Sequence, residues 1–210
     1  YLNGQLLKYV FMVVFTTALS FGLTYMFGYE DEASSVPAED EEAGAIIEEE
    51  TTGTVPASLQ DETIISPIVG QAVALENVND PVFSSGAMGQ GIAIKPTEGV
   101  VYAPADAEVT IAFATGHAFG LKTANGAEVL IHVGIDTVSM NGEGFDQKVA
   151  QGDKVKAGDV LGTFDSAKIA AAGLDDTTMV IVTNTADYAS VTPVANGAVA
   201  KGDAIIEVKA

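Results

Sequence analysis

Two histidines, His117 and His132, are the side chains best suited to chemistry in this chain. The 210 residues contain no cysteine, so thiol nucleophiles, thiolate metal ligands and disulfides are excluded within them. A neutral imidazole can act as a nucleophile, an acid–base group or a metal ligand. Three uses of the pair therefore stay open. They are attack on phosphorus to form a phosphohistidine, zinc binding with Asp136 as a candidate third ligand, and a purely structural role.

The sequence between the two histidines predicts a β-hairpin that brings them together. It reads HAFGLKTANGAEVLIHV, and its Asn125-Gly126 pair suits a two-residue type I′ turn. In that register His132 faces Phe119 and lies diagonal to His117 on the same side of the hairpin. Diagonal neighbours on one face of a sheet are ~7–8 Å apart at Cα. We therefore expect the two rings to meet.

The same register predicts two hairpin faces of different character, because successive side chains of a strand point to opposite sides. The face expected to form the core carries Val129, Ile131, Val133, Ala118 and Gly120. The other face carries both histidines together with Phe119, Leu121 and Leu130. An apolar surface around two polar rings suits a protein partner that excludes water when it docks.

The elements that would position this hairpin are mostly β-strands. From residue 63 onward, short apolar runs such as VYAPADAEVTIAFA alternate with turn signals. This pattern is typical of an all-β fold, an antiparallel β-sandwich or barrel with short helical turns, over residues 63–210. One stretch, DSAKIAAAGL, favours a short helix.

Two segments precede the predicted β-domain. Residues 1–28 include YVFMVVFTTALSFGLTYMF, nineteen residues without a charge. At ~1.5 Å per residue they could cross a hydrocarbon core of ~30 Å, so we expect one transmembrane helix. Residues 29–62 are rich in Asp, Glu, Ser, Thr, Pro and Gly, which predicts an acidic, disordered and flexible linker. Because the chain starts at Tyr1 without an initiating Met, we expect it to be the C-terminal piece of a longer protein.

The charge of the chain argues against a nucleic-acid partner. The formal net charge is −20, with nine Lys and Arg residues against twenty-nine Asp and Glu residues. Proteins that bind the phosphate backbone present a basic patch, and this composition does not supply one. We therefore expect no nucleic acid among the partners.

Residues 66–210 resemble the glucose-type IIA domain of the bacterial phosphoenolpyruvate-dependent sugar phosphotransferase system. Six stretches carry the resemblance in the family's order: SPIVGQAVALENVNDPVFSSGAMGQGIAIKP, VYAPADAEVT, TGHAFGLKT, EVLIHVGIDTVSMNGEGF, GDKVKAGDVLGTFD and KGDAIIEV. The resemblance implies that His132 takes phosphate from the phosphohistidine of the carrier protein HPr and hands it to a cysteine of a IIB domain. It implies no cofactor beyond phospho-HPr as donor, and no metal site. A ring of ordinary pKa would lose reactivity below about pH 6.

The resemblance also implies roles for residues around His132. His117 would hydrogen-bond the phosphoryl group, Thr115 would support the His117 ring, and Asp136 would lie beside the phosphohistidine. HPr and IIB would dock on apolar positions, namely Phe83, Met88, Phe113 and Val138.

The upstream segments match the ending of permeases of the β-glucoside type. In these proteins the IIC transport domain ends in a helix and a linker before a fused IIA domain. The resemblance therefore implies a IIC domain in the same permease and a IIB domain ahead of it. It also implies sugar uptake coupled to phosphorylation, and a cell-membrane location with the IIA domain facing the bacterial cytoplasm.

Two other functions compete with phosphoryl transfer. A swinging-arm carrier of the biotinyl or lipoyl type would share the strand-turn patterns VYAPADAEV and GDKVKAGDVLG. It needs an exposed lysine at a hairpin tip, whereas Lys168 lies in the stretch predicted to be helical. A zinc hydrolase would need a third ligand and a general base, and the sequence has neither an HExxH motif nor a third histidine.

Overall fold

The computed structural model of the chain describes residues 59–210. The predicted transmembrane helix, and the predicted linker up to residue 58, lie outside the described residues. Among the residues described, no helix combines the length and the apolar character that crossing a bilayer requires.

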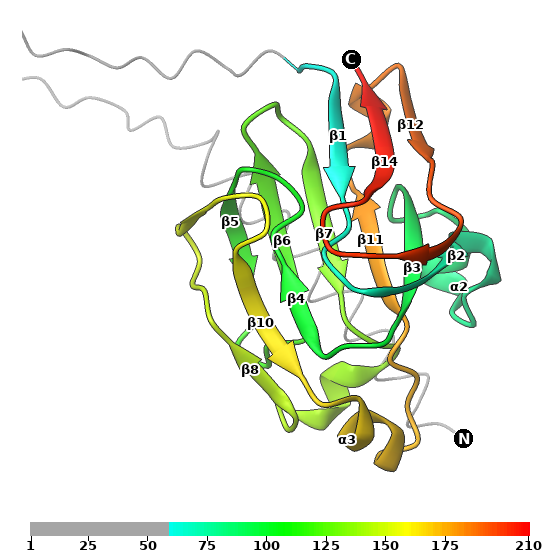
Figure 1. The fold of residues 1–210 in the computed structure, drawn as a ribbon, viewed down its shortest axis with the longest axis vertical. Helices are drawn as coiled ribbons and strands as arrows, with labels where there is room; N and C mark the ends of the chain where they lie inside the picture. The colour runs from blue at the N-terminus through cyan, green and yellow to red at the C-terminus, as the bar shows by residue number, and fades with distance from the viewer. Residues whose placement is uncertain (1–58) are drawn as a thin grey trace, which may run out of the picture. The chain divides into compact units, whose positions relative to one another are not determined.

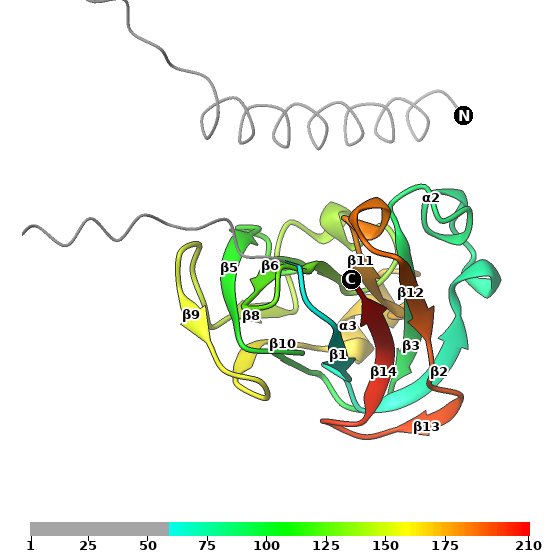
Figure 2. The same ribbon diagram turned by 90° about the horizontal axis from the view of Figure 1, so that it is seen from above.

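Residues 59–210 form antiparallel β-sheets with a few short helices, as the sequence pattern predicts (Figure 1). The largest sheet has eight strands in the order β13-β2-β3-β11-β7-β6-β5-β9. Their bounds are β2 Gly70–Ala74, β3 Gln90–Pro96, β5 Ala107–Ala112, β6 Ala118–Thr123, β7 Glu128–His132, β9 Lys154–Val155, β11 Thr178–Val182 and β13 Gly197–Val199. Figure 2 shows β5 and β9 on one side of the molecule and β2 and β13 on the other.

Two three-stranded sheets complete the fold. One has the order β1-β14-β12 and the other β4-β10-β8. Their strands are β1 Glu62–Ile65, β4 Val100–Tyr102, β8 Phe145–Gln147, β10 Val160–Phe164, β12 Ser190–Pro193 and β14 Ala204–Lys209.

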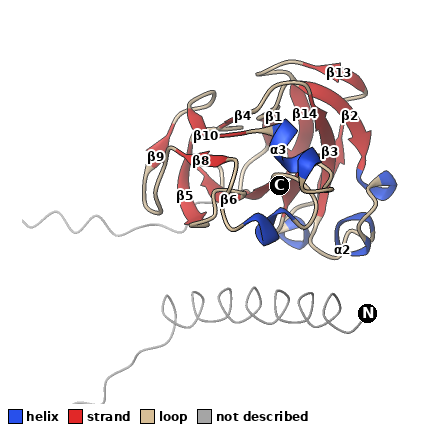
Figure 3. Ribbon diagram, turned by 90° about the horizontal axis from the view of Figure 1, so that it is seen from below, coloured by secondary structure: helices blue, strands red, loops and turns tan. Residues whose placement is uncertain are grey.

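The helices are short and lie on the outside of the strands (Figure 3). They are the α-helices α2 Pro81–Ser84 and α3 Ser166–Ala171, and the 3₁₀ helices η1 Leu75–Asn77, η2 Thr137–Met140 and η3 Thr185–Asp187. Helix α3 confirms the prediction from DSAKIAAAGL, and it begins where the Asp165 side chain accepts hydrogen bonds from the Ala167 and Lys168 amides. This is the usual way in which an aspartate satisfies the free amides of a first helical turn.

The large sheet buries apolar side chains on both faces at its centre. Strand β11 is buried at every position. Because successive side chains of a strand point to opposite faces, its apolar residues alternate between two clusters. Val180 and Val182 join the main core, which is built from all three sheets. Met179 and Ile181 join a smaller cluster with Leu75, Val78, Phe83 and Ala93. His132 lies directly opposite Met179 in the neighbouring strand, so it belongs to the face of the smaller cluster.

The predicted hairpin register is wrong by one residue. The structure pairs His132 with Ala118 instead of Phe119. Because a one-residue slip moves side chains to the opposite face, Phe119 and Leu121 lie in the main core, whereas Ala118 and Gly120 share the face of His132.

The turn explains this difference. Its loop has three residues, 124–126, because the Thr123 amide bonds the Ala127 carbonyl at 2.8 Å and the Gly126 amide bonds the Thr123 carbonyl at 3.1 Å. Gly126 has a φ of 101°, as expected for the glycine that closes a three-residue hairpin loop. The Thr123 hydroxyl and the Glu62 carboxylate both accept from the Ala127 amide, at 2.9 Å and 3.2 Å.

The folded part begins before residue 63, where the sequence placed its boundary. The Gln60 amide donates to the Asn125 carbonyl at 3.1 Å. Asp61 accepts from the Lys209 ammonium at 3.1 Å and from the Ala210 amide at 2.9 Å. The last residues of the predicted linker are therefore bound to the β-domain.

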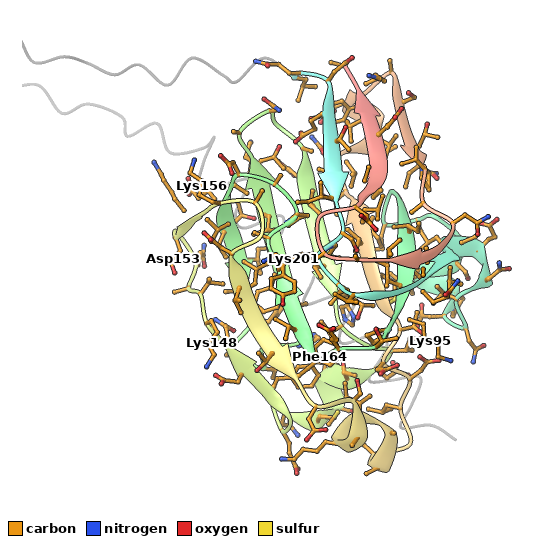
Figure 4. The ribbon with its side chains drawn as sticks, in the orientation of Figure 1. Lys95, Lys148, Asp153, Lys156, Phe164 and Lys201 are labelled. Atoms are coloured by element: carbon orange, nitrogen blue, oxygen red, sulfur yellow. The ribbon has the colours of Figure 1, made fainter. Side chains whose placement is uncertain are left out.

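Other charged side chains, including Lys148, Asp153 and Lys156, lie along the β8–β9 side (Figure 4).

Candidate functional site

His117 and His132 lie against each other, as the sequence predicts. Their ring centroids are 5.0 Å apart and their planes make an angle of 82°. His132 is the last residue of β7, and His117 comes immediately before β6, where its carbonyl accepts from the Val133 amide at 2.8 Å. His117 thus lies outside the regular alternation of β6, which is why the rings meet although the register differs. Both are buried, with 0% of His117 and 6% of His132 exposed.

The backbone after β7 sets the tautomer of His132. Its Nδ1 atom lies 2.8 Å from the Gly134 carbonyl oxygen. A carbonyl can only accept, so Nδ1 carries the hydrogen and Nε2 of the neutral ring keeps its lone pair. Gly134 has a φ of 76°, and a Cβ at this position would overlap the Thr137 side chain and approach the Asp175 carbonyl. Glycine is therefore required where the chain turns beside the ring.

His117 has one bonded and one unbonded ring nitrogen. The Thr115 hydroxyl lies 2.5 Å from its Nδ1. Its Nε2 is buried and has no hydrogen-bond partner within residues 59–210. If the Thr115 hydroxyl donates to Nδ1, the hydrogen of the neutral ring is on Nε2. A buried donor without an acceptor is costly in free energy, so this nitrogen is prepared for an incoming oxygen atom.

Burial keeps both rings neutral at ordinary pH. It lowers the pKa of His117 to about 3, with a further contribution from the charge of His132. It also lowers the pKa of His132 to about 4, although the hydrogen bond to Gly134 and the charges of Asp80 and Asp136 act in the opposite direction. The lowered pKa contradicts the expectation of an ordinary pKa for His132, and it moves the expected loss of reactivity to a lower pH. The physical reason is the depth of the ring, which the sequence register did not reveal.

Two carboxylates act on His132, and sequence reasoning identified one of them. Asp136 is exposed and adopts a left-handed conformation with a φ of 58° before η2. Asp80 was missed. Its carboxylate accepts from the Val82 and Phe83 amides at 2.7 Å and 3.2 Å, which starts α2 beside the site. The Asp-Pro pair does predict a helix start, but only the fold brings that start near a histidine.

Aromatic rings flank the histidine pair. Phe83 packs on His132 with centroids 5.2 Å apart, and Phe113 packs on His117 at 5.4 Å. Met88 packs against the same small cluster as Phe83. Val138 is half-buried in η2, two residues beyond Asp136.

Helix α2 also carries an exposed apolar side chain that the sequence did not single out. Val82 follows Pro81 in α2 and is 50% exposed, the highest value among the three exposed large apolar side chains in the described part of the chain.

The zinc alternative required three ligands at one place. Within residues 59–210, no group of three or more His, Cys, Asp or Glu side chains is arranged to hold a metal ion. Asp136 therefore does not complete a ligand set with His117 and His132 in this structure.

Comparison with known proteins identifies the family. The family described as phosphoenolpyruvate-dependent sugar phosphotransferase system, EIIA 1, matches residues 62–188, which is more than half of the chain. This chain belongs to that EIIA family. The family match gives no support to a biotinyl or lipoyl carrier or to a zinc hydrolase, and Lys168 lies in α3 instead of at a hairpin tip.

Two related proteins align with different lengths of this chain. The β-glucoside-specific EIIBCA component of the phosphotransferase system of Dickeya chrysanthemi is 45% identical over 196 residues, which are 93% of this chain and 29% of the relative. The glucose-specific EIIA component of Bacillus cereus is 46% identical over 142 residues, 68% of this chain and 86% of the relative. The chain therefore spans less than a third of the longer EIIBCA relative and most of the shorter EIIA relative.

The fold agrees with that of a solved EIIA structure. The glucose permease IIA from Mycoplasma capricolum has a TM-score of 0.65 and 34% sequence identity, over 70% of this chain and 96% of that chain. Together these comparisons show that the β-domain of this chain is an EIIA domain, of a family whose function is phosphoryl transfer.

Proposed function

We propose that His132 is the phosphoacceptor of this EIIA domain. In the first step Nε2 attacks the phosphorus of phospho-HPr, forming an N–P bond while the N–P bond of the donor breaks. In the second step a cysteine thiolate of a IIB domain attacks the same phosphorus, the S–P bond forms as the Nε2–P bond breaks, and His132 leaves as the neutral ring. The observation that carries this proposal is the Nδ1 contact with Gly134, which leaves Nε2 as the nucleophilic atom.

His117 would stabilise the phosphoryl group through its other ring nitrogen. The unpaired Nε2 belongs to a ring whose centroid is 5.0 Å from that of His132, and a hydrogen there could bond a phosphoryl oxygen. Thr115 would hold the ring in this tautomer by donating to Nδ1. A donor fixed in advance in a site of low dielectric stabilises charge more than the same donor in water.

Asp80 and Asp136 would shape the energetics of transfer. Their negative charges act to raise the pKa of His132, although burial has the larger effect and lowers it. The same charges would repel a phosphoryl group on Nε2, which keeps the phosphohistidine reactive enough to pass its phosphate on. They would also attract a basic side chain of a docking partner, which favours correct orientation and fast association.

The apolar rim would form the docking surface for HPr and IIB. Phe83 and Phe113 touch the histidine rings, Met88 packs beside Phe83, and Val138 lies in the neighbouring η2. A partner that covers this rim would exclude water from the phosphohistidine, which strengthens the polar interactions inside.

The upstream residues would join this domain to a membrane permease. The 196 aligned residues of the Dickeya chrysanthemi relative exceed residues 59–210, so the similarity extends upstream of the β-domain. We propose that residues 1–28 end a IIC transport domain and that residues from 29 onward form the linker. The EIIA domain would then face the cytoplasm of a bacterium and serve sugar uptake at the cell membrane.

A labelling experiment tests the phosphoacceptor. The purified chain is incubated with phosphoenolpyruvate, enzyme I and HPr, with omission of HPr as the control. We expect one phosphate per chain, labile in acid and stable in base, as for a phosphohistidine. Absence of HPr-dependent phosphate, or a phosphate with the opposite lability, would overturn the proposed function.

A further inference from the structure

A single peptide group connects His132 to a loop on the next strand. The carbonyl of the Gly134–Ile135 peptide accepts from His132 Nδ1 at 2.8 Å. The amide of the same peptide, on Ile135, donates to the Asp175 carbonyl at 2.8 Å. The two hydrogen bonds form a chain, and each bond in such a chain polarises the next.

The side chain of Asp175 fixes the turn that presents its carbonyl. Its Oδ1 atom accepts from the Thr177 amide at 2.8 Å and from the Thr177 hydroxyl at 2.6 Å. Thr177 is buried, with 8% of its surface exposed, and β11 begins at the following residue. This is the turn in which an aspartate bonds the backbone two residues further on.

The surroundings of Asp175 favour its ionised form. Burial acts to raise the pKa of the carboxyl, but the bonds from Thr177 and the charge of Lys95 outweigh it and lower the pKa. Lys95, labelled in Figure 4, follows Ile94 in β3, which faces Thr178 in β11. The acceptor of the turn is thus a carboxylate, whose hydrogen bonds are stronger than those of a neutral acceptor.

The loop around Asp175 and the loop after His132 are packed without space between them. A Cβ on Gly134 would lie 2.9 Å from the Asp175 carbonyl oxygen. His132 also pairs with Met179 across β7 and β11, four residues after Asp175. The position of the Gly134 carbonyl is therefore determined by the turn at residues 175–177 as well as by β7.

We propose that Asp175 is a positioning residue for phosphoryl transfer. Its turn holds the Gly134–Ile135 peptide so that the carbonyl bonds Nδ1 of His132, and this keeps the lone pair on Nε2. The inference rests on the proposed role of His132, because the tautomer matters for function only if Nε2 is the nucleophile. A neutral imidazole without this acceptor would populate both tautomers, and the form with hydrogen on Nε2 cannot attack phosphorus.

Nitrogen NMR of the histidine rings tests the positioning without any phosphate. Spectra of the full chain labelled with ¹⁵N report which nitrogen of His132 carries the hydrogen. We expect Nδ1–H in the unchanged chain, a mixture of tautomers in Asp175→Ala, and Nδ1–H again in Asp175→Asn, whose side-chain oxygen still accepts from Thr177. Asp176→Ala, a change of the adjacent acidic residue, is the matched control and should leave the ring unchanged.

Transfer rates supply the functional readout. We expect Asp175→Ala to slow phosphate uptake from phospho-HPr about threefold to tenfold, the effect of losing one or two ordinary hydrogen bonds. Asp175→Asn should lose less than Asp175→Ala, because its amide oxygen still accepts from Thr177 but more weakly than a carboxylate, and Asp176→Ala should stay close to the unchanged rate. Thr177→Val removes only the hydrogen bond from the Thr177 hydroxyl to Asp175, so it should slow phosphate uptake by a smaller factor. This variant replaces Asp175→Ala in the test if Asp175→Ala does not fold.

The two hypotheses fail in distinguishable ways. An unchanged His132 tautomer in folded Asp175→Ala and Thr177→Val variants would overturn the positioning role. A chain that accepts no phosphate, but whose tautomer responds to these substitutions, would overturn the proposed function and leave the structural coupling standing.

Discussion

His117 and His132 meet edge to face at 5.0 Å, and the structure gives their four ring nitrogens different environments. Nδ1 of His132 is bound to a carbonyl and Nδ1 of His117 to a hydroxyl. The two Nε2 atoms remain for a ligand. This arrangement supports the proposal that His132 acts as the nucleophile and His117 as a hydrogen-bond donor to the phosphoryl group.

Replacement of His132 should abolish phosphate acceptance. We expect His132→Ala to show no HPr-dependent labelling, because in the proposed tautomer Nε2 of His117 carries the hydrogen and has no lone pair for attack. The measurement is incorporation of phosphate from phosphoenolpyruvate in the presence of enzyme I and HPr. Labelling of this variant at the level of the unchanged chain would move the acceptor to another residue.

Replacement of His117 should separate the two halves of the reaction. We expect His117→Ala to accept phosphate still, but to pass it to a IIB domain about 10²–10³ times more slowly, the loss typical of removing one donor to a developing charge. Single-turnover transfer from the purified phospho-chain to IIB measures this step. Equal rates for both chains would show that His117 is not a stabilising group.

The pH dependence should follow the lowered pKa of His132. In the proposed mechanism the ring attacks in its neutral form, so we expect its reactivity to be present above the folded pKa of about 4 and to be lost as the pH falls through that value. An NMR titration of the His132 ring should therefore show a midpoint near pH 4, well below the reference value of about 6.5. A midpoint near the reference value would mean that the ring is not buried in solution as it is in this structure.

Substitution of Gly134 should destabilise the fold. We expect Gly134→Ala to lower the free energy of unfolding by about 2 kcal/mol or more, because a positive φ and overlap with Thr137 act together. Gly152→Ala is the matched control, since Gly152 has a φ of 91° but nothing within 4 Å of the added atom. Denaturant unfolding measures the free energy of unfolding of both variants, and the difference between them gives the contribution of packing around Gly134. If both variants lost the same stability, the overlap with Thr137 would not contribute.

The sequence by itself determined the class of fold and singled out His117 and His132 as the candidate reactive residues. Alternating apolar runs are a local property of a strand, so the β-rich domain and the α3 helix could be predicted without tertiary information. The absence of cysteine and the spacing of His117 and His132 pointed to imidazole chemistry. The motifs around these residues identified the family.

Only the tertiary structure decided the register, the environment of the rings and their supporting groups. The Asn125-Gly126 pair is compatible with loops of two or three residues, and Glu62, more than sixty residues upstream, bonds the Ala127 amide in the longer loop. The pKa of His132 depends on burial beneath segments distant in sequence, among them α2 with Asp80. Asp175 likewise reaches His132 only because β11 pairs with β7. Local periodicity carries no information about such contacts, since they arise when strands far apart in the chain are packed side by side.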